Sequence, residues 1–135
     1  MAQVQSLRNR AVVVEKDVSI AASSGTTVGI SVGAGTVVLA VGFEPYDTVP
    51  DITTYTMDIT DGTTVFADDL SFDNTAAGVI KVGSTVGVVA AADTIDIVTT
   101  ISGSPGVITG RVFAVIVDVN ADWDVPGAVD RDQLA

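Results

Sequence analysis

Short segments in which apolar and polar residues alternate recur along this 135-residue chain. In the first, residues 11–20, Val12, Val14, Val18 and Ile20 fall on one side, and polar or charged residues fall on the other. A period of two residues is typical of a half-buried β-strand. The chain also has 25 Val and 16 Thr but only 4 Leu, and β-branched side chains favour strands over helices. We therefore predict an all-β protein without a helix of normal length.

Turn signals rich in Gly, Pro, Asn and Asp divide these segments into eight or nine short strands. The expected strands cover residues 11–20, 26–32, 36–43, 53–60, 63–70, 79–82, 86–90, 94–101 and 110–120. This regular spacing is typical of a sandwich or barrel. The predicted fold is an antiparallel β-sandwich of about eight strands, jelly-roll-like, formed by residues 11–120. Residues 1–10 and 121–135 lose the alternation, so we expect an N-terminal and a C-terminal arm.

The composition argues against most enzyme mechanisms. The chain has no Cys and no His, so it lacks thiol nucleophiles and both the commonest general base and the commonest metal ligand. The nearest carboxylate pairs, Asp47 with Asp51 and Asp122 with Asp124, stand in expected loops beside prolines. Neither a phosphate-binding loop nor another catalytic constellation is present. We therefore expect a protein that is not an enzyme and that needs no cofactor.

The formal net charge of −11 limits the partners. Nucleic-acid phosphates and anionic lipid surfaces repel such a chain, so we expect neither a nucleic acid nor a membrane as its partner. No apolar run approaches the 18 residues that a spanning helix needs. The abundant apolar residues must then be buried within the fold or against other subunits.

Four aspartates, Asp58, Asp61, Asp68 and Asp69, crowd into residues 53–70. A two-residue loop at Asp61-Gly62 favours a tight hairpin in which residue 60 pairs with residue 63. In that register Asp61 lies at the turn, the other three divide between two faces, and Asp69 lies roughly 13 Å along the strand from the residue opposite Asp58. Metal ligands must converge on one ion. We therefore predict an ordinary turn with a solvated face and no metal site.

Two expected strands, residues 36–43 and 110–120, are apolar on both faces. An antiparallel strand of this kind is covered on both sides. In a chain without helices one cover is the second sheet, and the simplest other cover is another copy of the chain. We therefore expect a homo-oligomer with closed symmetry. The interface is assigned to Val38, Ala40, Val112, Ala114 and Ile116.

The two arms carry their own signals. Three of the six positive charges, Arg8, Arg10 and Lys16, lie in the first 16 residues. The only tryptophan, Trp123, stands in the polar stretch ADWDVPG. Trp is enriched at interface hot spots, so Trp123 is a candidate anchor for the C-terminal arm in a neighbour's pocket. The alternative is that Trp123 folds back on its own domain.

The strings SIAASSGTTVGISVGAGTVVLAVGF, residues 19–43, and TTYTMDITDGTTVFADDL, residues 53–70, resemble small β-structural proteins of tailed bacteriophages. The nearest type is the capsid cement, or decoration, protein, and the resemblance extends over residues 11–120. Such proteins are often trimers that sit on the outside of the head and bridge neighbouring major capsid proteins. The resemblance implies a structural virion protein on the outer capsid surface, in which Arg8, Arg10 and Lys16 belong to the arm that binds the major capsid protein.

Two other functions remain open from the sequence. One is a glycan-binding β-sandwich of a phage fibre or tail, for which Tyr46, Tyr55 and Trp123 are the plausible exposed aromatic residues. The other is a module stabilised by calcium at an aspartate-rich loop.

Overall fold

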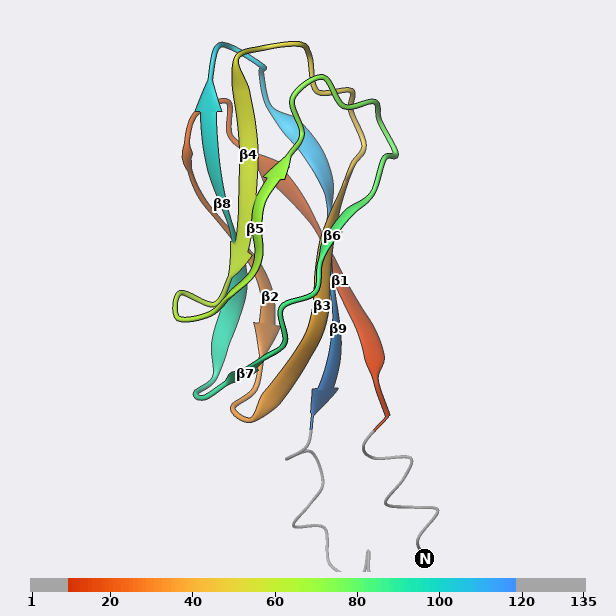
Figure 1. Cartoon of the computed structure of the whole chain (residues 1–135), viewed down its shortest axis with the longest axis vertical. Coiled ribbons are helices and arrows are strands. Elements are labelled where there is room, and N and C mark those ends of the chain that lie inside the picture. Colours follow the sequence, from red (N-terminus) through yellow and green to blue (C-terminus); the bar gives the residue numbers. More distant parts are fainter. Residues whose placement is uncertain (1–9, 119–135) are drawn as a thin grey trace, which may run out of the picture.

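The computed structural model describes residues 10–118, which form nine β-strands and no helix (Figure 1). This confirms the predicted all-β class. The strands are β1 Val12–Ile20, β2 Gly25–Val32, β3 Thr36–Pro45, β4 Thr54–Thr60, β5 Val65–Ser71, β6 Lys81–Gly83, β7 Gly87–Val89, β8 Asp93–Ser102 and β9 Ile108–Asp118.

The strands form two antiparallel sheets. The first sheet has the order β1-β9-β3-β6, and β7 also pairs with β3; the second has the order β2-β8-β4-β5. Because β6 and β7 pair with successive parts of β3, they act as one interrupted strand. The first strand then pairs with the last, the second with the next to last, and so on inward to the β4–β5 hairpin. The successive pairs form one long antiparallel ribbon of two strands, which is rolled up into two facing sheets. This arrangement is a jelly roll and confirms the predicted sandwich.

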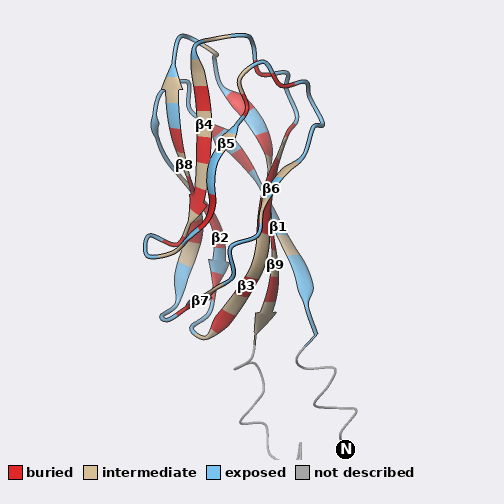
Figure 2. Cartoon of the chain, viewed as in Figure 1, coloured by how far each residue is buried: buried red, intermediate tan, exposed pale blue. Residues whose placement is uncertain are grey.

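The core lies between the two sheets and is built mainly by alternate residues of the long strands, with Val49 and Phe72 added from the loops. Figure 2 shows the result as buried stripes along β3, β4 and β9. The largest fully buried side chains include Tyr55, Phe43, Phe66 and Phe72. The rings of Phe43 and Phe72 meet edge to face with their centroids 5.5 Å apart. Each such side chain stabilises the fold by about 1.5–3 kcal/mol through removal of apolar surface from water.

Four of the five residues assigned to an oligomer interface belong to this core instead. Val38, Val112 and Ala114 are fully buried and Ile116 is 8% exposed, all between the two sheets of the same chain. The interface prediction is therefore wrong for these four. A period of two residues tells which side chains share a face. When both faces of a strand are apolar, it does not tell which one points inward. Ala40 lies on the outer side, opposite Val115.

The β4–β5 hairpin also differs from its prediction. Thr60 pairs with Val65 rather than with Thr63, so the loop spans residues 61–64. Oδ1 of Asp61 accepts hydrogen bonds from the backbone N–H groups of Thr63 (2.9 Å) and Thr64 (2.7 Å), which holds the wider turn together. Four large apolar side chains of this hairpin are nevertheless buried in the core: Tyr55, Met57, Ile59 and Phe66.

Most of both arms lies outside the described residues, and so do Arg8 and Trp123. Arg10 is described and exposed, immediately before β1. The described residues contain no helix of the length and hydrophobicity that a membrane crossing would take.

Candidate functional site

The outer faces of the two sheets differ sharply in polarity. On the second sheet the middle strands β4 and β8 point mainly hydroxyl and carboxylate groups outward. Thr56 lies opposite Thr100, and Thr60 lies opposite Asp96. Such polar groups can be satisfied by water or by local hydrogen bonds, as between Thr60 and the Thr64 carbonyl, so this face does not need to be covered by another protein.

The first sheet points apolar side chains outward from its three longest strands. On β9, Val115 lies between Val13 of β1 and Ala40 of β3, and its neighbour Val117 lies opposite Val37. Together with Phe113, these residues form a continuous patch, which we call the apolar outer face: Val13, Val37, Ala40, Phe113, Val115 and Val117. Two exposed valines, Val82 and Val88, extend the patch onto β6 and β7.

Phe113 lies across the neighbouring strand because residue 42 is a glycine. A Cβ atom on Gly42 would stand 2.4 Å from Cζ of the Phe113 ring, so any larger residue would displace the ring. On the other side, the guanidinium carbon of Arg111 lies 5.5 Å from the ring centroid. This cation–π geometry places Phe113 at the junction between the apolar outer face and a charged border.

The charged border crosses the same three strands. Arg111 forms ion pairs with Glu15 on β1 (3.3 Å) and Glu44 on β3 (2.9 Å), and the hydrogen bond to Glu15 is the main cause of its raised pKa. Next to them, the Tyr46 hydroxyl donates a 2.6 Å hydrogen bond to Asp17, which raises the Tyr46 pKa. The charged groups of this border are therefore paired with one another within the domain, although the buried Nε of Arg111 has no hydrogen-bond partner among the described residues. The apolar outer face, in contrast, is not covered by any described strand.

The start of β1 is exposed on both sides. Val12 shares the inner side with Ile116, its partner in the pairing, yet it is 46% exposed, and Val13 on the outer side is 61% exposed. Figure 2 shows this part of β1 as exposed, next to the end of β9. The apolar surface therefore continues from the outer face around the end of the first sheet.

The predicted basic residues do not gather at this face. Lys16 lies on the inner side of β1, and its Nζ donates a 3.2 Å hydrogen bond to the Gly29 carbonyl of β2. Arg10 precedes β1 and is exposed. The structure thus places Arg10 and Lys16 at separate points along one edge strand of the first sheet.

Nor do the described aromatic residues form a sugar-binding platform. Tyr55 is 1% exposed and belongs to the core, whereas Tyr46 is 46% exposed and bonded to Asp17. A hollow of about 150 Å³ lies between the 61–64 loop and residues 88–93. Ordinary small-molecule sites are roughly 300–1,000 Å³.

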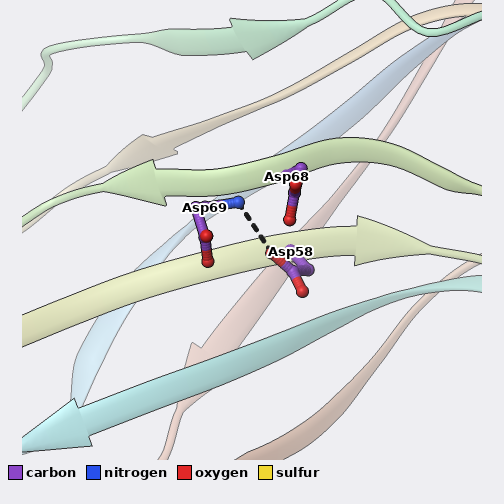
Figure 3. Close-up of side chains that lie close together, drawn as sticks. All are labelled: Asp58, Asp68 and Asp69. Atoms are coloured by element: carbon purple, nitrogen blue, oxygen red, sulfur yellow. Dashed lines mark hydrogen bonds between the residues drawn. The ribbon is translucent and has the colours of Figure 1, made fainter.

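Three of the four hairpin aspartates do come together, which the predicted register excluded (Figure 3). Met57 pairs with Leu70 and Ile59 with Ala67, so Asp58 faces both Asp68 and Asp69 across a β-bulge. One carboxylate oxygen from each of these three aspartates lies within 4.8 Å of the others. The prediction that they scatter is wrong, because it assumed a ladder without bulges.

Electrostatic repulsion dominates this acidic cluster of Asp58, Asp68 and Asp69. The charges of Asp69 and then Asp58 raise the pKa of Asp68. Carboxylate oxygens are the ligands of hard cations. Ca²⁺ takes 6–8 oxygens, and three carboxylates reach the lower limit of six only if each of them binds through both of its oxygens. Asp68 and Asp69 are also exposed, as acidic groups commonly are without an ion. The absence of a metal site here stays a prediction.

No protein-family model and no curated protein matches the chain. Two solved structures of bacteriophage capsids contain a similar fold. A chain of the Helicobacter pylori bacteriophage KHP30 capsid has a TM-score of 0.60 and 10% identity, over 82% of this chain and 94% of that one. A chain of the cyanophage Pam1 capsid asymmetric unit has a TM-score of 0.60 and 17% identity, over 80% and 84%.

At these identities the likeness shows the fold alone. The coverage adds one fact about the two capsid chains. Because the match takes in most of each chain, both consist of little more than a sandwich of this size. They are therefore small chains rather than large proteins with a jelly roll inserted.

Proposed function

We propose that this chain is a non-enzymatic structural virion protein of the capsid cement, or decoration, type. It binds the outer surface of a phage head and stabilises the contacts between major capsid proteins. The observation that carries this proposal is the pairing of fold with size: the described chain is one jelly roll, and chains of the same fold and similar extent occur in two phage capsids.

The surface supports a role in assembly rather than in chemistry. The apolar outer face is a contiguous patch of the kind that marks interaction sites. The charged groups that border it form ion pairs and a hydrogen bond with one another, which is a structural arrangement rather than a catalytic one. We accordingly propose that the chain works as a homo-oligomer, most simply a trimer, and that its other partner is the major capsid protein.

The basic start of the chain is the proposed attachment point on the head. Arg10 is exposed where the chain enters β1, and Arg8 lies two residues before it, outside the described residues. The described body is acidic, with 13 Asp and Glu residues against 4 Lys and Arg residues in positions 10–118. A basic start on an acidic body would orient the molecule on a shell whose surface carries both signs.

The test uses heads of the phage that encodes the chain, assembled without it. We expect the full-length chain to sediment with these heads and to raise the temperature at which they release DNA. The double variant Arg8→Ala/Arg10→Ala should bind several-fold more weakly, whereas Lys81→Ala, which removes a positive charge from the body, should bind like wild type. A full-length chain that neither binds heads nor stabilises them would overturn the proposal.

The oligomer is tested separately by the mass of the purified chain under native conditions. A trimer is expected at micromolar concentration. A mass equal to that of one chain at every concentration would contradict the oligomer.

A further inference from the structure

The apolar outer face lacks a cover within residues 10–118. Its six residues lie on three adjacent strands, and every described strand that could pack on this sheet is already on the opposite side of it. Apolar surface left in water costs about 25 cal/mol per Å². Covering this face with apolar side chains would therefore be favourable, and the ion pairs of Arg111 along its border need no partner from outside for their charges.

The dimensions of the face favour a single extended segment as that occupant. Three strands and the adjoining β6–β7 ribbon with Val82 and Val88, about 4.8 Å apart, and a run of five residues at about 3.3 Å each give a patch of roughly 19 by 16 Å. A standard interface between two folded proteins takes about 800 Å² from each partner. The patch is far smaller than that, but it matches the footprint of a short stretch of chain.

The chain itself has such a segment next to the face. β9, the middle strand of the face, ends at Asp118, which lies opposite Thr36 at the margin of the patch. Seventeen residues follow, 119–135, and they include Val119, Trp123 and Val125. In an extended form this segment could reach at most about 56–61 Å, several times the length of the patch.

The direction of β9 decides which copy receives the segment. β9 runs out at the end of the sandwich, where β1 begins (Figure 1). To cover its own face, the chain would have to turn back on itself after Asp118, whereas it can reach a neighbouring molecule without a reversal. In a closed ring each copy then gives one segment and receives one, so no face is left bare.

We propose that residues 119–135 of one copy bind across the apolar outer face of a neighbouring copy, with Trp123 as the anchor. This rests on the homo-oligomer in the proposed function and names the contact that closes it. Trp is suited to the role because it buries a large apolar area at low cost in conformational entropy.

Two variants test this contact by complementation. The first ends at Asp118, so it keeps the face but has no segment and no tryptophan. The second is the full-length chain with Val115→Lys, which keeps the segment but places a charge in the middle of the face. Each alone is expected to remain monomeric. After mixing, the two should form one-to-one mixed pairs, because only the truncated chain offers an intact face and only Val115→Lys offers a segment. In these pairs the emission of Trp123 should shift to the blue and become several-fold less sensitive to iodide.

The matched control is Val98→Lys in the full-length chain. Val98 also points outward from a middle strand and is partly buried, but it lies on the second sheet, opposite Asp58. This variant should assemble like wild type and keep the blue-shifted emission of Trp123. Val13→Lys changes a residue of the apolar outer face that is 61% exposed, so it is not expected to disturb folding. If Val13→Lys behaves like Val115→Lys, a local folding defect at residue 115 is not the cause.

The outcomes separate the two proposals. An emission of Trp123 that does not change on mixing would overturn the exchange between copies, and so would blue-shifted emission from a chain that stays a monomer. If heads bind the wild-type chain while these signals are absent, the inference fails and the proposed function stands. If the variants complement each other but no head binds the oligomer, the proposed function fails and the contact stands.

Discussion

The backbone N–H of Asp69 donates a 2.7 Å hydrogen bond to Oδ1 of Asp58 across the β4–β5 pair. Asp69 has a φ angle of 52°, a left-handed conformation that Asp tolerates better than most residues. The bond therefore fixes the bulge that turns both Asp68 and Asp69 toward Asp58. The hydrogen bond that fixes the hairpin thus also brings three carboxylates close together, and their mutual repulsion destabilises the fold.

Replacing Asp68 with Asn is expected to stabilise the protein at neutral pH. The raised pKa of Asp68 means that its charged form is disfavoured in the folded state. The protonated Asp68 side chain therefore contributes stability that is fully present below the pKa of Asp68 in the unfolded chain. This contribution is lost as the pH rises through the pKa of Asp68 in the folded protein. The urea midpoint of Asp68→Asn should exceed that of wild type at pH 7, and the difference should shrink toward pH 4. An equal difference at both pH values would refute the repulsion.

Replacing Asp47 with Asn is expected to have the opposite effect. The Asp47 carboxylate accepts hydrogen bonds from the backbone N–H (2.9 Å) and the hydroxyl (2.8 Å) of Thr109, which lower its pKa. This stability is present above the unfolded pKa and is lost as the pH falls through the folded pKa. Asp47→Asn should lower the urea midpoint at pH 7 and converge with wild type in acid. Asp51→Asn, in the same loop, serves as the control and should change the midpoint little.

Replacing Asp61 with Ala should destabilise the hairpin loop. Asp61 is 8% exposed and its carboxylate accepts two backbone hydrogen bonds, and the loss of hydrogen bonds to a charged group costs about 1.5–3 kcal/mol. Asp61→Asn retains an acceptor oxygen and should recover at least half of that loss. Chemical denaturation of both variants measures it. If Asn proves as destabilising as Ala, the hydrogen bonds are not what the loop depends on.

Replacing Tyr55 with Phe should leave the fold intact and stabilise it by about 1 kcal/mol, because a buried hydroxyl without a partner carries its desolvation cost. Tyr55 Oη is buried and has no hydrogen-bond partner within the described residues. Burial also raises the pKa of Tyr55 to about 12. Wild type should therefore lose stability as the pH rises from about 10 to 12, and Tyr55→Phe should lose less. Identical melting curves of the two proteins at pH 11 would contradict this.

The strands were predictable because their signal is local. Residues 94–101 were expected to form a strand and β8 covers Asp93–Ser102, since alternation between Ile and polar side chains can be seen without knowing the partner strand. In residues 53–60 the same alternation puts Tyr55, Met57 and Ile59 on one side of the strand, and all three are buried in the core.

What the sequence could not supply was the relation between strands. Two bulges in β5 move Asp68 and Asp69 opposite Asp58, and a bulge leaves no mark in a pattern of alternation. On β9, Val115 and Ile116 are equally apolar, and only the position of the second sheet makes Ile116 the inner one. The acidic cluster and the apolar outer face were both missed for this reason.

The pairing of β1 with β9 also bears on how the chain reaches its native state. Val12 pairs with Ile116, so forming this contact closes a loop that contains nearly the whole domain. Closing so long a loop costs more entropy than forming the β4–β5 hairpin, and proteins dominated by such distant contacts fold in about milliseconds to seconds. The two ends of the sandwich domain are thus expected to come together last, after the inner strands of the ribbon have docked.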